Sequence, residues 1–130
     1  MGPFILIVDD EPTVRKVLTE MLSDTHFQPV EAASAGDALK LLRQRGPQIS
    51  VLITDIRRPG ILDGLDLAKF TRNSWPWIKI IVTTGFAESV EDLPDNVRFL
   101  PKPWRVDEMM ACVLNESGEF LPMQSAGGVR

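Results

Sequence analysis

The chain has 130 residues, a length that fits one domain with its own hydrophobic core. It is 44% hydrophobic and 25% charged, near the average for globular proteins, so widespread disorder is not expected. A net charge of −4 argues against a partner that is nucleic acid, and a single cysteine, Cys112, excludes a disulfide framework and a cysteine-based zinc site. The longest apolar runs are far too short to cross a bilayer, and no secretory signal is recognisable. We therefore expect a cytoplasmic protein with no membrane partner.

Short apolar runs alternate with stretches of helical periodicity along most of the chain. The runs cover Phe4–Val8, 27–32, 51–53, 78–82 and 97–100. Most of them are rich in β-branched residues and do not alternate with polar ones, which is typical of strands covered on both faces. The second run is more polar, and we expect it at a sheet edge.

Helical spacing of apolar residues follows each run. The expected helices begin at Pro12, after an N-cap at Ser34, and near residue 65, and then cover 86–93 and 106–115. Strands that alternate with helices predict right-handed βαβ units, so the fold class is α/β with a doubly wound parallel sheet. We expect one domain over residues 1–117 and a flexible C-terminal tail over 118–130.

Polar residues gather where the predicted strands end. Asp9 and Asp10 follow the first run, Asp55 ends the third, Thr83 ends the fourth, and Lys102 follows the fifth. Ligands of an open α/β sheet bind at this carboxyl edge. Neighbouring carboxylates repel one another, and Mg²⁺, which prefers oxygen ligands, removes that conflict. Asp55 is then a candidate nucleophile, with Lys102 and a threonine hydroxyl available to hold phosphoryl oxygens.

Four motifs carry a resemblance to a known family. They are Val8-Asp9-Asp10-Glu11, Thr54-Asp55 with Pro59-Gly60 and Asp63-Gly64, Val82-Thr83-Thr84-Gly85, and Pro101-Lys102-Pro103. In this order and spacing they resemble the receiver domains of two-component response regulators (CheY-like), over roughly residues 4–116. The resemblance implies a five-stranded parallel sheet of order 2-1-3-4-5 and a cis Lys102–Pro103 bond.

The resemblance also implies how phosphate and metal are bound. Asp55 would accept a phosphoryl group from a sensor histidine kinase or a histidine phosphotransfer protein. Asp10, Asp55 and the main-chain carbonyl of Arg57 would bind Mg²⁺, with Asp9 acting through water.

Three further residues have roles implied by the resemblance. Thr83 is the switch hydroxyl, Lys102 pairs with Asp55 or its phosphate, and Phe99 is the aromatic that changes rotamer. Such a domain is no conventional enzyme, since it catalyses only its own Mg²⁺-dependent phosphorylation and slow autodephosphorylation. It signals by protein contact with a downstream partner or as a homodimer.

The sequence also departs from the usual family pattern. The loop over residues 58–64 is one residue longer, an extension that resembles a subset of stand-alone single-domain receivers. Arg57 and Gly85 stand where the family tunes dephosphorylation, so the phosphoryl lifetime is not predicted. The helix over 86–93 is closed early by Pro94, which leaves the usual output surface in question.

Three other functions compete with this interpretation. A phosphatase of the haloacid dehalogenase type would need a second Asp two residues after Asp55, where Arg57 stands. A pseudo-receiver would bind partners without phosphorylation, but the complete set of site residues argues against a loss of phosphorylation. A nucleotide-binding module would need a glycine-rich turn after the first strand, where carboxylates stand instead.

Overall fold

The structure is a computed structural model that describes residues 3–56, 64–84 and 97–114. The strands are β1 (Phe4–Val8), β2 (Gln28–Ala32), β3 (Ile49–Ile56), β4 (Lys79–Thr84) and β5 (Val97–Pro101). The helices are α1 (Pro12–Met21), α2 (Ala35–Arg45), α3 (Gly64–Ser74) and α4 (Val106–Val113), with short 3-10 turns η1 (Leu22–Asp24) and η2 (Gly46–Gln48). The helix predicted over 86–93, the carbonyl of Arg57, most of the lengthened loop and the predicted tail lie outside the described residues.

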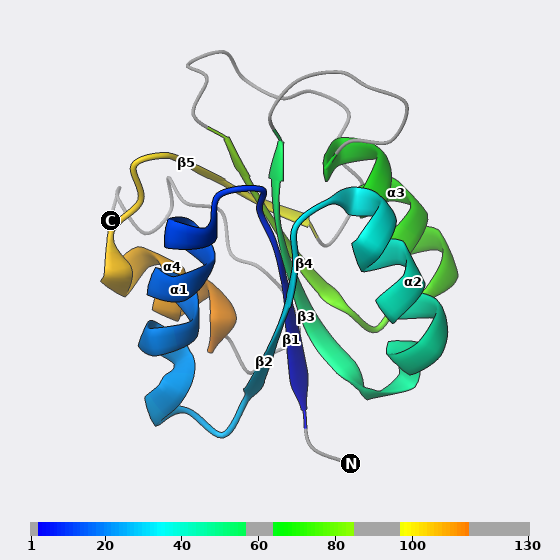
Figure 1. Cartoon of the computed structure of the whole chain (residues 1–130), viewed down its shortest axis with the longest axis horizontal. Coiled ribbons are helices and arrows are strands. Elements are labelled where there is room, and N and C mark those ends of the chain that lie inside the picture. Colours follow the sequence, from blue (N-terminus) through cyan, green and yellow to red (C-terminus); the bar gives the residue numbers. More distant parts are fainter. Residues whose placement is uncertain (1–2, 57–63, 85–96, 115–130) are drawn as a thin grey trace, which may run out of the picture.

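The sheet has the order β2-β1-β3-β4-β5, and every neighbouring pair is parallel. Figure 1 shows α1 and α4 against one face of this sheet and α2 and α3 against the other. The predicted fold class and strand order are therefore confirmed. Within the described segments, no helix is both long enough and apolar enough to span a membrane.

The hydrophobic core has two parts, one on each face of the sheet. Leu6, Leu52 and Ile80 belong to the cluster that includes residues of α2 and α3, whereas Ile7 and Ile53 belong to the cluster that includes residues of α1 and α4. Successive strand residues therefore alternate between two buried faces. This explains the uninterrupted apolar runs in the central strands β1, β3 and β4.

Local signals in the sequence place two of the helices. Pro12 lies in the first turn of α1, where its missing N–H is not needed. The Ser34 hydroxyl accepts a hydrogen bond from the Asp37 backbone N–H at 3.1 Å, which confirms the predicted N-cap of α2.

The strands extend further than the apolar runs predicted. β3 continues through Asp55 to Ile56, and β4 continues to Thr84, because Asp55 pairs with Thr83 and Ile56 with Thr84 in the parallel ladder. Backbone pairing does not depend on side-chain polarity, so hydrophobic patterning ends these strands too early. The last helix is also shorter than predicted, since α4 ends at Val113.

A close contact joins two connections at the amino ends of the strands. Gly46, in η2 before β3, lies directly beneath the indole of Trp75, which precedes β4, and a Cβ atom on Gly46 would overlap that ring. Trp75 also meets Phe70 of α3 edge-on, with ring centroids 5.7 Å apart. Only glycine fits beneath Trp75 in this arrangement.

Candidate functional site

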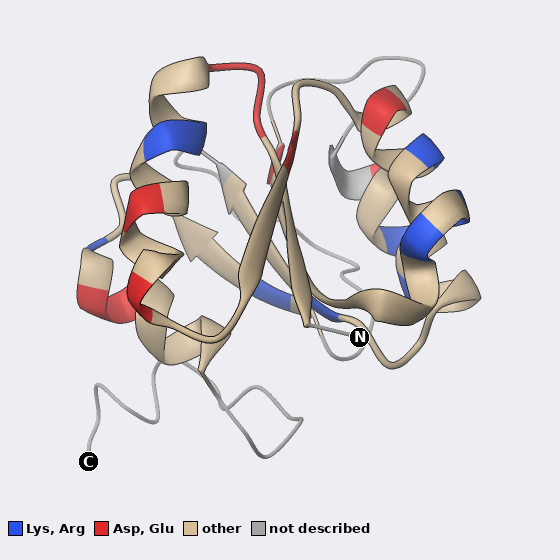
Figure 2. Cartoon of the chain, turned by 60° about the horizontal axis from the view of Figure 1, so that its bottom comes forward, with Lys and Arg blue, Asp and Glu red and all other residues tan. Residues whose placement is uncertain are grey.

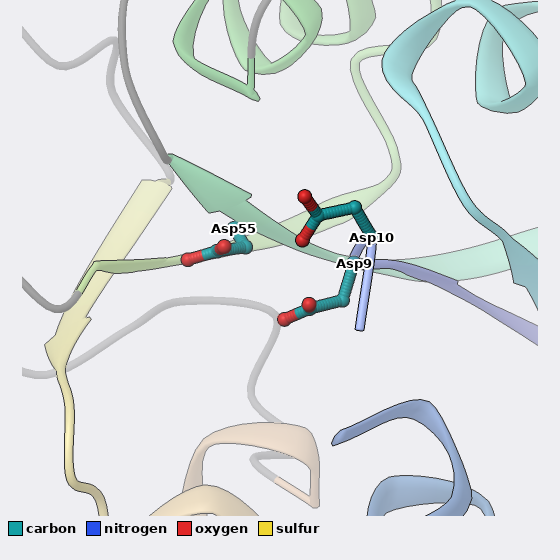
Figure 3. A group of neighbouring side chains, drawn as sticks. All are labelled: Asp9, Asp10 and Asp55. Atoms are coloured by element: carbon teal, nitrogen blue, oxygen red, sulfur yellow. The ribbon is translucent and has the colours of Figure 1, made fainter. Parts of the chain in front are cut away.

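Strand register brings the predicted site residues together. Val8 of β1 pairs with Thr54 of β3, and Asp55 of β3 pairs with Thr83 of β4. Asp9, which follows Val8 directly, therefore lies at the same edge of the sheet as Asp55. In Figure 3, Asp9 and Asp10 lie side by side at the end of β1 and face Asp55 at the end of β3.

The three aspartates form one acidic cluster. Each offers a carboxylate oxygen, and these three oxygens lie within 4.8 Å of one another. Asp9 and Asp55 are buried, whereas Asp10 is exposed. Figure 2 shows this concentration of acidic residues at the tips of the central strands. Burying two carboxylates so close together is unfavourable unless positive charge compensates them.

Lys102 supplies part of that compensation. Its Nζ atom lies 3.3 Å from Asp9 Oδ2 and 3.3 Å from Asp55 Oδ1, so one ammonium group bridges two carboxylates. The Lys102 side chain is 23% exposed, while those of Asp9 and Asp55 are 2% and 3% exposed. The Lys102–Pro103 bond is cis, as the resemblance implied.

Thr83 and Phe99 occupy different surroundings. The Thr83 hydroxyl donates to Asp55 Oδ1 at 3.5 Å, the outer limit of a hydrogen bond, so this contact is weak. Phe99 pairs with Val82 in the ladder and packs, partly buried, against the cluster on the α2–α3 side. The structure therefore brings Thr83 to Asp55 and places Phe99 in the core. The switching roles of both residues stay predictions.

Arg15 is a contributor to the site that the sequence reasoning missed. Its Nη1 donates to the main-chain carbonyl of Asp9 at 2.7 Å, and its Nε forms an ion pair with Glu31 of β2 at 2.9 Å. No local motif marks this arrangement, because Arg15 and Glu31 are 16 residues apart in the chain. Parallel pairing of β1 with β2 brings them together.

The donor set fits a magnesium ion. All three carboxylates offer hard oxygen ligands, the kind that Mg²⁺ prefers. Ligands bound at about 2.0–2.1 Å from one ion lie at most about 4 Å apart. The spacing of at most 4.8 Å in the cluster therefore requires only small side-chain shifts.

The sequence profile of the response regulator receiver domain matches residues 5–114. The chain belongs to this family. Its fold, with strand order β2-β1-β3-β4-β5, agrees with that assignment.

Relatives of this receiver domain include longer regulatory proteins. It is 34% identical over 115 residues to the hydrogenase transcriptional regulatory protein HoxA of Cupriavidus necator, covering 84% of this chain and 23% of that protein. It is 31% identical over 113 residues to the sensor kinase CckA of Brucella abortus, covering 84% of this chain and 12% of that protein. The chain thus spans less than a quarter of these relatives, and its stand-alone status stays a prediction.

Solved structures agree with the assignment. A response regulator receiver protein from Pseudomonas putida is 27% identical and superimposes with a TM-score of 0.70. The match covers 89% of this chain and 98% of that chain. The similarity therefore extends over nearly the whole of a known receiver structure.

Cys112 lies away from the receiver site. It is buried within the cluster that includes residues of α1 and α4, as expected for a small core residue. Burial raises the pKa of its thiol, an effect that the nearby Arg98 partly opposes and Glu108 adds to. The neutral thiol is therefore the stable form, and Cys112 is a packing residue in this fold.

Proposed function

We propose that this receiver domain accepts a phosphoryl group on Asp55. The donor is the phosphohistidine of a sensor histidine kinase or of a histidine phosphotransfer protein. The observation that supports this proposal most directly is the position of Asp55, a buried carboxylate within reach of Lys102, Thr83 and two further aspartates.

The chemistry is a substitution at phosphorus. A carboxylate oxygen of Asp55 forms a bond to phosphorus, the phosphorus–nitrogen bond of the donor breaks, and the electron pair leaves with the imidazole. Lys102, already 3.3 Å from Asp55, pairs with the new phosphoryl oxygens. The ammonium thereby offsets the negative charge added beside Asp9.

Asp10, Asp55 and the carbonyl of Arg57 are the proposed magnesium ligands, and Asp9 acts through water. When bound, Mg²⁺ neutralises charge on the incoming phosphoryl group. The chain itself keeps the carboxylates close to one another. Catalysis extends only to the domain's own phosphorylation and to slow hydrolysis of the aspartyl phosphate.

Phosphorylation then shifts a population between two states. The phosphoryl group adds about −1.5 to −2 charge and three acceptor oxygens. These favour the state in which Thr83 and Lys102 close on the site and Phe99 changes rotamer. The output is protein contact in the cytoplasm, with a downstream partner or a second copy of the chain and without nucleic acid or membrane.

Intact mass after incubation with Mg²⁺ and acetyl phosphate tests the proposal. We expect the wild type to gain one phosphoryl group and the Asp55→Asn variant to gain none. Asp107→Asn, which changes an exposed carboxylate of α4 in the same way, is the matched control and should be phosphorylated normally. The proposal fails if Asp55→Asn is phosphorylated like the wild type, or if a magnesium-bound wild type accepts no phosphoryl group from acetyl phosphate or phosphohistidine.

A further inference from the structure

Several hydrogen bonds hold Asp9 at the end of β1. The Asp9 N–H donates to the Ala32 carbonyl at 3.2 Å, and Asp9 Oδ1 accepts from the Glu11 N–H at 2.9 Å. The Asp9 carbonyl accepts from Arg15 Nη1 at 2.7 Å, the shortest of these contacts. Each of these groups of Asp9 is therefore held by a different part of the chain.

Arg15 is itself held in place for this contact. Its guanidinium pairs through Nε with Glu31 Oε1 at 2.9 Å, and the Thr19 hydroxyl donates to Glu31 Oε2 at 3.3 Å. The Arg15 side chain is only 16% exposed. The planar guanidinium has several fixed donors, so it can bind a carboxylate and a carbonyl at once. Glu31 thus fixes the orientation in which Arg15 reaches Asp9.

The carbonyl that Arg15 binds belongs to the peptide unit that joins Asp9 to Asp10. The orientation of this peptide determines where the Cα atom of Asp10 lies and how its side chain leaves the backbone. Asp10 is exposed, so its carboxylate is not enclosed by the hydrophobic core. The backbone at Asp9 and Asp10 therefore contributes to the distance between the carboxylates of Asp10 and Asp55.

We propose that Arg15 is a positioning residue for magnesium. Oriented by Glu31, its guanidinium holds the Asp9–Asp10 peptide so that the Asp10 carboxylate faces Asp55 at a spacing that one ion can bridge. This inference rests on the proposed function, in which these carboxylates bind Mg²⁺. Outer contacts of this kind orient metal ligands, and their loss commonly lowers metal affinity by roughly 10–100-fold.

The direction of the change in Mg²⁺ affinity distinguishes a positioning role of Arg15 from an effect of its charge. Arg15 is a cation near a site for a divalent cation, so removing its charge alone would tighten Mg²⁺ binding through reduced repulsion. Removing a positioning contact weakens binding instead. The two explanations thus predict opposite changes in affinity for the same substitution.

Calorimetric titration of the metal-free protein with MgCl₂, at constant ionic strength, measures this change. We expect Arg15→Ala to raise the Kd for Mg²⁺ about tenfold. Arg15→Lys keeps the charge but lacks the planar fork, and we expect it to raise the Kd as well. Arg105→Ala removes an exposed arginine–aspartate pair in which N and O are 3.1 Å apart, and as the matched control it should leave the Kd unchanged.

Unfolding by urea in EDTA provides the second readout. A purely structural role for Arg15 would lower the free energy of unfolding and leave the Kd of the folded protein as in the wild type, which would overturn the proposal. Unchanged or tighter Mg²⁺ binding by Arg15→Ala would overturn it too. If Arg15→Ala does not fold, Arg15→Lys and Glu31→Gln decide by the same criterion. A wild type that binds no Mg²⁺ would instead contradict the proposed function.

Discussion

Asp9 and Asp55 are both buried carboxylates at neighbouring strand ends, yet their surroundings differ. The main-chain carbonyl of Asp9 accepts from Arg15 at 2.7 Å and its Oδ1 accepts from the Glu11 N–H at 2.9 Å, while its Oδ2 shares the Lys102 ammonium with Asp55. The Lys102 ammonium and the Thr83 hydroxyl approach Asp55 at 3.3 and 3.5 Å. Short contacts fix a group in one position, whereas contacts near the outer limit of hydrogen bonding leave room for movement.

This difference matches the two tasks that we propose for the site. A metal site gains affinity when its ligands are already placed, because less ordering is needed on binding. A phosphoryl acceptor must instead admit a bulky new group and let its neighbours rearrange around it. We therefore expect the β1 end of the site to be preorganised and the β3–β4 end to be adjustable.

Replacing Asp10 with Asn should have the largest effect on the preorganised side. The variant keeps the backbone contacts of Asp9 but loses one negatively charged oxygen ligand. We expect a loss of Mg²⁺ affinity greater than the roughly tenfold effect of losing an outer contact. Calorimetric titration with MgCl₂ measures it, and an unchanged Kd would remove Asp10 from the proposed ligands. Asp107→Asn provides the control for loss of an exposed carboxylate.

Replacing Lys102 with Ala should lower the stability of the fold, because its ammonium contacts the carboxylates of both Asp9 and Asp55. Asp9 and Asp55 would then face one another without the bridging ammonium. Loss of one partner of a buried pair costs about 3–5 kcal/mol, and we expect about 1–3 kcal/mol here because solvent screens this ammonium. Urea unfolding in EDTA measures the loss of stability.

The effect of Mg²⁺ on the melting temperature tests whether Lys102→Ala acts through the lost positive charge. A divalent cation replaces the missing positive charge, so Mg²⁺ should raise the melting temperature of Lys102→Ala more than that of the wild type. Equal stabilisation of both proteins would show that Lys102 does not compensate the acidic cluster. Arg105→Ala, at an exposed ion pair, should behave like the wild type.

Replacing Thr83 with Ala should have the smallest effect on stability and should act on the adjustable side. Its hydrogen bond at 3.5 Å is long, so we expect a loss of less than about 1 kcal/mol and normal phosphorylation of Asp55. The response to phosphorylation should diminish, seen as smaller NMR shift changes in β4 and β5. Thr71→Ala changes a buried threonine of α3 and should keep the full response. A full response in Thr83→Ala would exclude its switching role.

The sequence predicts the sheet and the location of the site well, because apolar runs and the polar residues that follow them are local features of the sequence. Uninterrupted apolar runs mark strands that are buried on both faces, and the residues after them mark the carboxyl edge where Asp9, Asp55 and Thr83 meet. Contacts between distant segments leave no such mark. The pairing of Arg15 with Glu31 depends on β1 lying against β2 in one register, and a single sequence does not state that register.

The contact between Gly46 and Trp75 has a consequence for how this domain can change over time. It closes the amino ends of β3 and β4, whereas the acidic cluster occupies the carboxyl ends of the same strands. A side chain at position 46 would displace the indole and reduce stability without touching the phosphoryl chemistry. Substitutions at position 46 would therefore alter the stability of this sheet from the end opposite to the acidic cluster.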